Sequence, residues 1–224
     1  MSDNYDRHNT VDKNSRAYKI AAGGGVMNLP NKLTIARVVM IPVFILFFYL
    51  EFSGHYFVAL AVFALASFTD MLDGKIARKY GLVTNLGKFL DPIADKVLVS
   101  SALIVLVTVP GFFTAYLGGW AIIAGGCCVA VIFARELIVS GFRMVAADSG
   151  IVIAADKIGK LKTVTQDISV VLLLVFGGLY ELIAESVAAE VVNYVALVMF
   201  ALSALLTVLS GVNYIIKNIQ VLKV

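Results

Sequence analysis

Long apolar segments alternate with short polar stretches along most of the chain. Each apolar segment holds about 20 residues or somewhat more, which is the length an α-helix needs to cross a bilayer. The pattern predicts an all-α integral membrane bundle of six transmembrane helices. We expect these helices over residues 33–50, 56–80, 91–109, 120–147, 163–180 and 191–216.

The composition agrees with this interpretation. Hydrophobic residues make up 60% of the 224 positions and charged residues 15%, and the mean hydropathy is +0.93. These values lie outside the range of soluble globular domains. We therefore expect one membrane domain over residues 27–224, without a separate soluble domain. The net charge of +3 gives no reason to expect a nucleic-acid partner.

Residues 1–26 differ from the rest of the chain. They are polar and charged, and they contain no apolar run of the kind a signal peptide needs. We interpret them as a disordered polar tail or leader that precedes the membrane domain.

Lysine and arginine residues fall in alternate connections between the apolar segments. The stretches 75–88 and 143–162 and the C-terminal tail carry them. The stretches 51–55, 110–119 and 181–190 contain no Lys or Arg, and the first and last of these contain glutamates. Because positively charged loops stay on the cytoplasmic side, both termini are expected in the cytoplasm. The alternation also favours an even number of helices.

Four aspartates interrupt the apolar pattern between residues 70 and 95. Asp70 and Asp73 are spaced i,i+3, and Asp91 and Asp95 are spaced i,i+4, so each pair lies on one face of its own helix. An Asp near the centre of a membrane helix costs roughly 2.5 to 3.5 kcal/mol. One pair alone is also explained by a solvated helix end, but four acids together need neutralising cations.

Carboxylate oxygens without His or Cys are typical ligands of Mg²⁺ or Mn²⁺. We predict that two such ions are held, one by Asp70, Asp73 and Asp91 and a second by Asp91 and Asp95. Such a pair of ions suits displacement at a phosphorus atom. Asp91 is predicted as a helix cap, with Pro92 in the first turn of the helix that follows.

The complete acidic stretch reads Asp-x2-Asp-Gly-x2-Ala-Arg-x8-Gly-x3-Asp-x3-Asp. It resembles the signature of the CDP-alcohol phosphatidyltransferase family. The resemblance implies that Asp95 acts as general base toward an acceptor hydroxyl, although a role as a metal ligand only is the alternative. It further implies a site for the CDP-lipid that is lined by motif residues, namely Gly74, Ala77, Arg78 and Gly87. For Gly74 and Ala77, close packing of helices is the alternative.

A first supporting cluster opens the first apolar segment. Asn31 has the properties of an N-cap, and Thr34 and Arg37 follow at helical spacing. An Arg at that depth either extends to the membrane interface or faces a polar cavity. The segment also resembles the opening of bacterial phosphatidylglycerophosphate synthases, which favours contact of these three residues with the nucleotide or a phosphate.

A second cluster lies in the fourth segment and the stretch after it. Arg135 and Arg143 are predicted to face the bundle interior, and with Lys160 they would bind the phosphate of an anionic acceptor. The alternative pairs Arg135 with Glu136 or with a motif Asp. Two arginines at this depth favour glycerol 3-phosphate or inositol phosphate over a phosphate-free alcohol such as serine or choline.

The resemblance to phosphatidylglycerophosphate synthases extends along nearly the whole chain from Met27. It implies transfer of a phosphatidyl group from CDP-diacylglycerol to glycerol 3-phosphate, with release of CMP, by a homodimer. The site would face the cytoplasm from the inner membrane of a bacterial cell. The alternatives are a family member with inositol phosphate or serine as acceptor, a Mg²⁺-dependent membrane prenyltransferase, and a transporter that uses the carboxylates as a cation path.

Overall fold

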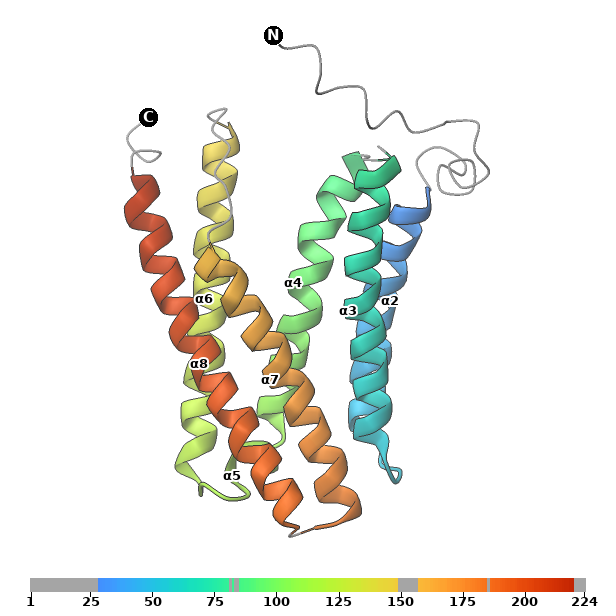
Figure 1. Ribbon diagram of the computed structural model, residues 1–224, viewed down its shortest axis with the longest axis vertical. Coiled ribbons are helices and arrows are strands. Elements are labelled where there is room, and N and C mark those ends of the chain that lie inside the picture. The colour runs from blue at the N-terminus through green and yellow to red at the C-terminus, as the bar shows by residue number, and fades with distance from the viewer. Residues whose placement is uncertain (1–27, 81, 83–84, 149–156, 185, 220–224) are drawn as a thin grey trace. The chain divides into compact units, whose positions relative to one another are not determined.

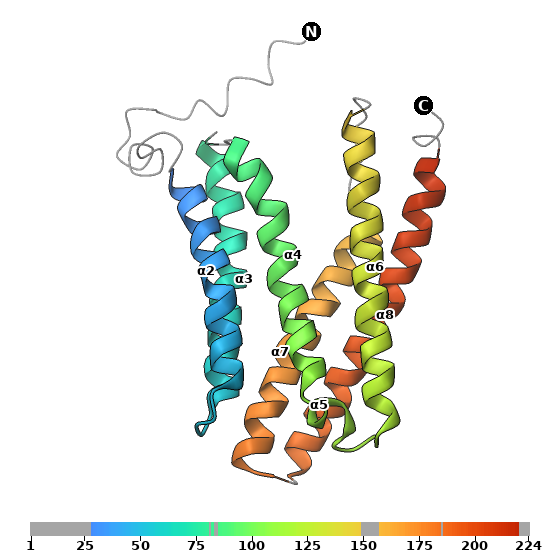
Figure 2. The same ribbon diagram turned by 180° about the vertical axis from the view of Figure 1, so that it is seen from behind.

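The computed structural model describes residues 28–80, 82, 85–148, 157–184 and 186–219. Within its helices, the side chains at positions 71, 78, 85–92, 95, 147–148 and 157 lie outside the described part. Every regular element in the described ranges is a helix (Figures 1 and 2). These helices are α2 (Leu29–Tyr49), α3 (His55–Tyr80), α4 (Asn85–Thr108), α5 (Gly111–Thr114), α6 (Trp120–Asp148), α7 (Lys157–Leu182) and α8 (Val187–Asn218).

The six helices predicted from hydropathy correspond to α2, α3, α4, α6, α7 and α8. Among the described residues, five helices are long and apolar enough to cross a membrane, and α4 contributes a shorter apolar stretch, Lys96–Thr108. The chain is therefore a multi-pass membrane protein. The count of six spans stays a prediction, because the described apolar stretch of α4 is shorter than a membrane span. The N-terminal tail at residues 1–26 lies outside the described residues.

The start of α2 differs from the predicted one. The helix begins at Leu29, and the Asn28 side-chain oxygen accepts a hydrogen bond from the Asn31 backbone N–H at 3.1 Å. Asn28 is thus the N-cap, and the prediction that Asn31 has this role is wrong. The reason is Pro30, which fits the first turn of a helix because its missing N–H is not needed there. The Asn28 amide also donates to the Leu82 carbonyl at 2.8 Å.

The start of α4 also differs from the predicted one. α4 begins at Asn85, so Asp91 and Pro92 lie inside the helix, and the prediction of a cap at Asp91 is wrong. Residues 85–90 extend the helix by almost two turns in the N-terminal direction. Pro92 therefore removes a backbone hydrogen bond within the helix, a change that commonly kinks it.

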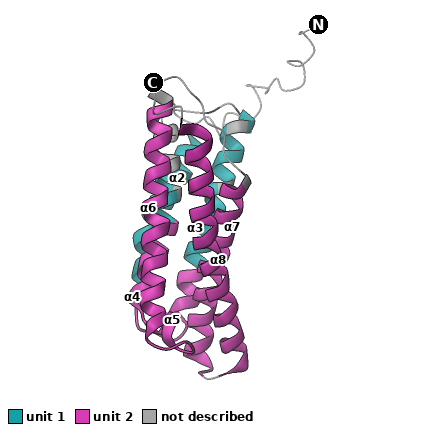
Figure 3. Cartoon of the chain, turned by 90° about the vertical axis from the view of Figure 1, so that its left-hand side faces the viewer, with its two compact units in different colours: residues 1–46, 61–98 teal, residues 47–60, 99–224 magenta. Residues whose placement is uncertain are grey.

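The chain divides into two compact units (Figure 3). The first unit contains residues 1–46 and 61–98, that is, most of α2, most of α3 and the beginning of α4. Within it, α2 and α3 lie side by side (Figures 1 and 2), with the buried rings of Phe44 and Phe63 at a centroid distance of 5.9 Å. This apolar contact fixes α2 against the helix that carries Asp70 and Asp73.

The second unit contains residues 47–60 and 99–224. Its helices α7 and α8 run antiparallel and pack side by side, and α6 packs against α8 (Figures 1 and 2). Ser186 caps α8, because its hydroxyl accepts from the Ala189 N–H at 3.1 Å. The hydroxyls of Ser203, Thr207 and Ser210 inside α8 donate to carbonyls of their own helix, as Thr207 does to Ser203 at 2.6 Å, so they are satisfied in an apolar setting.

The short helix α5 was not predicted, since hydropathy alone does not detect one turn of helix. Its Phe112 and Phe113 are each 2% exposed. The Asn193 amide of α8 donates to the Phe112 carbonyl at 2.9 Å, and the Phe113 ring lies 5.6 Å from that of Phe200. Two aromatic side chains and one hydrogen bond thus fix α5 within this unit.

The neighbouring glycines of α6 provide a test of this packing. A Cβ atom at Gly125 would lie 2.7 Å from the Phe113 ring, whereas one at Gly126 would only reach Val107 at 4.0 Å. Gly125→Ala is expected to lower the stability by about 1 to 3 kcal/mol through overpacking. Gly126→Ala should be neutral or raise it slightly, because Ala favours helix. Thermal unfolding in detergent measures both, and equal midpoints for the two variants would contradict the packing of Phe113.

Candidate active site

Arg37 is the centre of the first polar cluster. Its side chain is completely buried, with Nη1 2.6 Å from Asp70 Oδ1 and Nη2 2.5 Å from Asp73 Oδ2. The Arg37 Nε–H donates to the Ala66 carbonyl at 3.3 Å. One guanidinium of α2 therefore pairs with both acids of the first motif pair, each through a different nitrogen.

Thr34 and the two aspartates complete this cluster. The Thr34 hydroxyl lies 3.1 Å from the Pro30 carbonyl and 3.3 Å from Asp73 Oδ2, so its single hydrogen is shared between two acceptors. The side chain of Asp73 is 5% exposed, and that of Asp70 is 41% exposed. Asp73 is thus the buried member of the pair, and Asp70 opens toward the surroundings.

The structure joins two groups of residues that the sequence had left separate. Thr34 and Arg37, which were predicted to contact the nucleotide or a phosphate, contact Asp73 of the acidic motif. Their spacing of three residues puts both on one face of α2, which is the signal that sequence reasoning could have used. Asn31 is buried one turn earlier. Contact of any of these residues with a ligand stays a prediction.

The second half of the motif is described only in part. Gly74 and Ala77 lie on α3 after Asp73 and are partly exposed, while the side chain of Arg78 and those of Gly87, Asp91 and Asp95 lie outside the described part. Among the side chains that the structure does describe, no three His, Cys, Asp or Glu residues are close enough to hold a metal ion. Convergence of all four aspartates therefore stays a prediction.

The described half of the motif fits a hard divalent cation. Asp70 and Asp73 offer only oxygen ligands, and their carboxylates already share one positively charged partner, Arg37. Two carboxylates held this close favour bound positive charge. The donor set is the one that Mg²⁺ and Mn²⁺ prefer.

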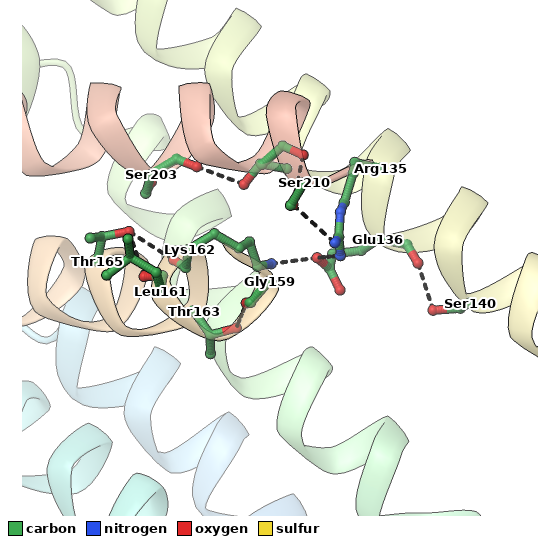
Figure 4. A network of polar contacts seen from close by, with 11 residues as sticks. Arg135, Glu136, Ser140, Gly159, Leu161, Lys162, Thr163, Thr165, Ser203 and Ser210 are labelled. Atoms are coloured by element: carbon green, nitrogen blue, oxygen red, sulfur yellow. Dashed lines mark hydrogen bonds and ion pairs between the residues drawn. The ribbon is translucent and has the colours of Figure 1, made fainter. Parts of the chain in front are cut away.

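The second predicted cluster forms a network within the other unit (Figure 4). The Arg135 guanidinium donates to Glu136 Oε1 at 3.0 Å and to the Ser210 hydroxyl of α8 at 3.0 Å. Lys162 of α7 donates to the same Glu136 oxygen. The alternative in which Arg135 pairs with Glu136 is confirmed, and this pairing explains how an Arg is accommodated far inside an apolar helix.

Lys162 is the member of this network that sequence reasoning missed. Its side chain is 6% exposed, whereas the predicted Lys160 is exposed. The two lysines lie two residues apart on α7, so they face in different directions. The spacing could have shown that only one of them faces α6, but not which one.

Arg143 does not face the interior, so that part of the prediction is wrong. The residue is exposed near the end of α6. Its Nε–H donates to the Tyr214 hydroxyl at 3.3 Å, and the guanidinium lies 5.5 Å from the centre of the Tyr214 ring. The Tyr214 ring on α8 thus stabilises the Arg143 guanidinium at the surface through a cation–π contact.

Membrane-spanning helices that carry carboxylates as the only potential metal ligands suit an enzyme that acts on phosphate esters with the help of divalent ions. Comparison with known sequences identifies the class. The family profile described as CDP-alcohol phosphatidyltransferase matches residues 27–209. The chain belongs to this family, which agrees with the resemblance seen in the motif and does not agree with a prenyltransferase or a transporter.

Individual relatives are similar over most of their length. A protein of Bacillus subtilis named CDP-diacylglycerol–glycerol-3-phosphate 3-phosphatidyltransferase is 40% identical over 210 residues, which cover 88% of this chain and 98% of that protein. A protein of the same name from Rickettsia typhi is 37% identical, over 84% of this chain and 94% of that protein. A probable phosphatidylglycerophosphate synthase of Mycobacterium tuberculosis is 37% identical, over 90% of this chain and 87% of that protein.

The position of Arg37 leads to a prediction about stability. Arg37→Gln is expected to destabilise the metal-free protein by about 3 kcal/mol, because two neighbouring carboxylates lose the cation they share. Added Mg²⁺ should recover part of this loss, since the same carboxylates would bind it. Thermal unfolding in EDTA and in Mg²⁺ measures both effects.

Lys32→Gln is the matched control, since Lys32 lies on the same helix and is exposed. It removes the same charge, and it should change neither the stability in EDTA nor the stabilisation by Mg²⁺. A stabilisation by Mg²⁺ that is equal in Arg37→Gln and in wild type would contradict a link between Arg37 and a cation site at Asp70 and Asp73.

Proposed function

We propose that this protein transfers the phosphatidyl group of CDP-diacylglycerol to glycerol 3-phosphate, giving phosphatidylglycerophosphate and CMP. The observation that carries the proposal is the complete acidic motif, whose first two acids are held at one point by Arg37. The family match and the names of the relatives from Bacillus subtilis and Rickettsia typhi support the same reaction.

The motif residues would have different roles at the CDP-lipid. Asp70, Asp73, Asp91 and Asp95 would hold two Mg²⁺ or Mn²⁺ ions, which when bound supply charge neutralisation at the phosphates and at the leaving CMP. Arg37 and Thr34 fix the orientation of Asp73, so the carboxylate is in place before substrate arrives. Asp95 would accept the proton of the acceptor hydroxyl. Gly74, Ala77, Arg78 and Gly87 would border the nucleotide.

The second network supplies positive charge for an anionic acceptor. Arg135 and Lys162 share one carboxylate, that of Glu136, so the three side chains carry one positive charge in excess. A partly buried excess charge attracts a phosphate, and Arg binds phosphate in a forked geometry. Arg143 and Lys160 add positive charge nearer to the surface. Glycerol 3-phosphate fits this requirement better than serine.

The orientation and assembly are part of the proposal. Six spans in the inner membrane of a bacterial cell, with both termini and the active site on the cytoplasmic side, are supported by the Lys and Arg residues in alternate connections. The bacterial relatives support the same membrane. A homodimer is proposed from the family resemblance.

An acceptor panel tests the reaction directly. Purified protein with CDP-diacylglycerol and Mg²⁺ or Mn²⁺ should release CMP when glycerol 3-phosphate is added. Serine should support a rate lower by about tenfold or more, because it lacks the phosphate that would pair with the buried positive charge. Inositol phosphate, which carries that phosphate on a larger alcohol, is the second acceptor to compare. Chromatography of the lipid product and of CMP measures the outcome. A preference for another acceptor would contradict the assignment, and no release of CMP with any alcohol would contradict the proposed reaction class.

A substitution at Arg135 tests the acceptor site separately. Arg135→Ala is expected to raise the KM for glycerol 3-phosphate by about ten- to a hundredfold, the effect of losing a charge-assisted hydrogen bond. The KM for CDP-diacylglycerol should stay near the wild-type value. Lys217→Ala, at an exposed position of α8, is the control. Equal increases in both KM values of Arg135→Ala would indicate a general structural effect and contradict a specific acceptor contact.

A further inference from the structure

A cavity of about 550 Å³ lies within the second unit, at the end of the helices that carries the short connections 51–54 and 183–186. The beginning of α3, the short helix α5 and the end of α7 form it. It is lined by aromatic and acidic residues that include His55, Tyr56, Phe112, Phe176, Tyr180 and Glu181. The acidic motif lies at the other end of α3, so this cavity is no part of the proposed active site.

The walls of the cavity are aromatic and well packed. The Phe112 ring lies 5.2 Å from Tyr56 and 6.0 Å from Phe176, and the Phe176 ring lies 5.5 Å from Tyr180. Phe112 and Phe176 are each 2% exposed, so neighbours hold their rings in place. Fixed aromatic rings around a space of this size attract cations through their π faces.

A carboxylate and an imidazole add two acceptors to these walls. Glu181 Oε1 accepts from the Gly54 N–H at 2.9 Å, which orients the carboxylate. Its Oε2 lies 3.8 Å from His55 Nε2. His55 Nδ1 lies 3.3 Å from the Phe47 carbonyl, and because a carbonyl only accepts, this contact favours the tautomer that carries its proton on Nδ1. In the neutral imidazole Nε2 is then an acceptor that faces another acceptor, and a donor with several N–H groups would satisfy both.

The charge at this end of the molecule has one sign. Glu51 also lines the cavity, and the sequence has no Lys or Arg in the connections 51–54, 109–119 and 183–186. A cation would therefore meet no fixed positive charge from these connections. Neither CDP-diacylglycerol nor glycerol 3-phosphate carries an ammonium group, so the proposed substrates do not explain the cavity.

We propose that this cavity binds the primary ammonium head group of a membrane lipid. Glu181 and His55 accept the N–H groups, and the aromatic rings surround the adjoining methylenes. A primary ammonium is favoured over a quaternary one, because both acceptors need N–H donors. A lipid is favoured over a soluble amine, because Tyr180 and Phe52 are exposed where the helices end, as aromatic residues are at membrane interfaces.

Native mass spectrometry of the full chain in detergent tests this proposal. The probes are phosphatidylethanolamine, phosphatidylcholine and phosphatidylglycerol with identical acyl chains. Wild type is expected to bind phosphatidylethanolamine about tenfold more tightly than the other two lipids, the effect of a charge-assisted hydrogen bond. Glu181→Gln should reduce this preference to near unity while preserving an acceptor for Gly54. Glu190→Gln, an acid of α8 outside the lining, should retain it.

The affinities of the wild-type protein for the three lipids test the proposal even if a variant does not fold. Equal affinities for the three lipids would overturn the proposal, and so would an unchanged preference in folded Glu181→Gln. Free ethanolamine is the second arm. Displacement of the lipid by free ethanolamine at concentrations comparable to those of the lipid would show that the site takes a soluble amine, which would overturn the assignment to a lipid.

Discussion

The proposed chemistry depends on the pairing of one buried arginine with two carboxylates. Charges in a membrane-spanning helix are costly unless they are paired. Arg37 of α2 offsets this cost for Asp70 and Asp73 of α3 at once, and Thr34 adds a hydrogen bond to the more buried acid. The apolar contact of Phe44 with Phe63 fixes the two helices that bring these groups together. These contacts hold the two carboxylates in fixed orientations on neighbouring helices.

The same physical solution recurs in the second unit. Glu136 lies between Arg135 and Lys162, and Ser210 takes another hydrogen of the arginine. Gly211 makes room for this arrangement, since a Cβ atom there would lie 2.9 Å from Arg135 Cγ. Each unit thus contains a set of charges in which the partners come from different helices. In the first set two carboxylates share one arginine, and in the second an arginine and a lysine share one carboxylate. The first set therefore has negative charge in excess and the second positive charge in excess.

Much of the fold followed from the sequence, because hydropathy over 20 residues is dominated by the membrane itself. The ends of the helices were harder to predict from the sequence. Asn28 rather than Asn31 caps α2, and α4 starts before Pro92, since local hydrogen bonds and not hydropathy decide such boundaries. The motif acids were recognisable from spacing alone. Their partner Arg37 lies 36 residues before Asp73, and no local pattern encodes a contact between helices. For the same reason the sequence did not show that Lys162, and not Lys160, contacts Glu136.

The central claim is that the acids of α3 and α4 together hold two divalent ions. Mn²⁺ titration followed by electron paramagnetic resonance measures this in the purified protein. We expect two ions per chain whose signals are broadened by exchange between neighbouring metals, and we expect the coupled signal to disappear in Asp91→Asn. A single isolated Mn²⁺ signal that Asp91→Asn leaves unchanged, or no binding in the presence of CDP-diacylglycerol, would contradict the claim.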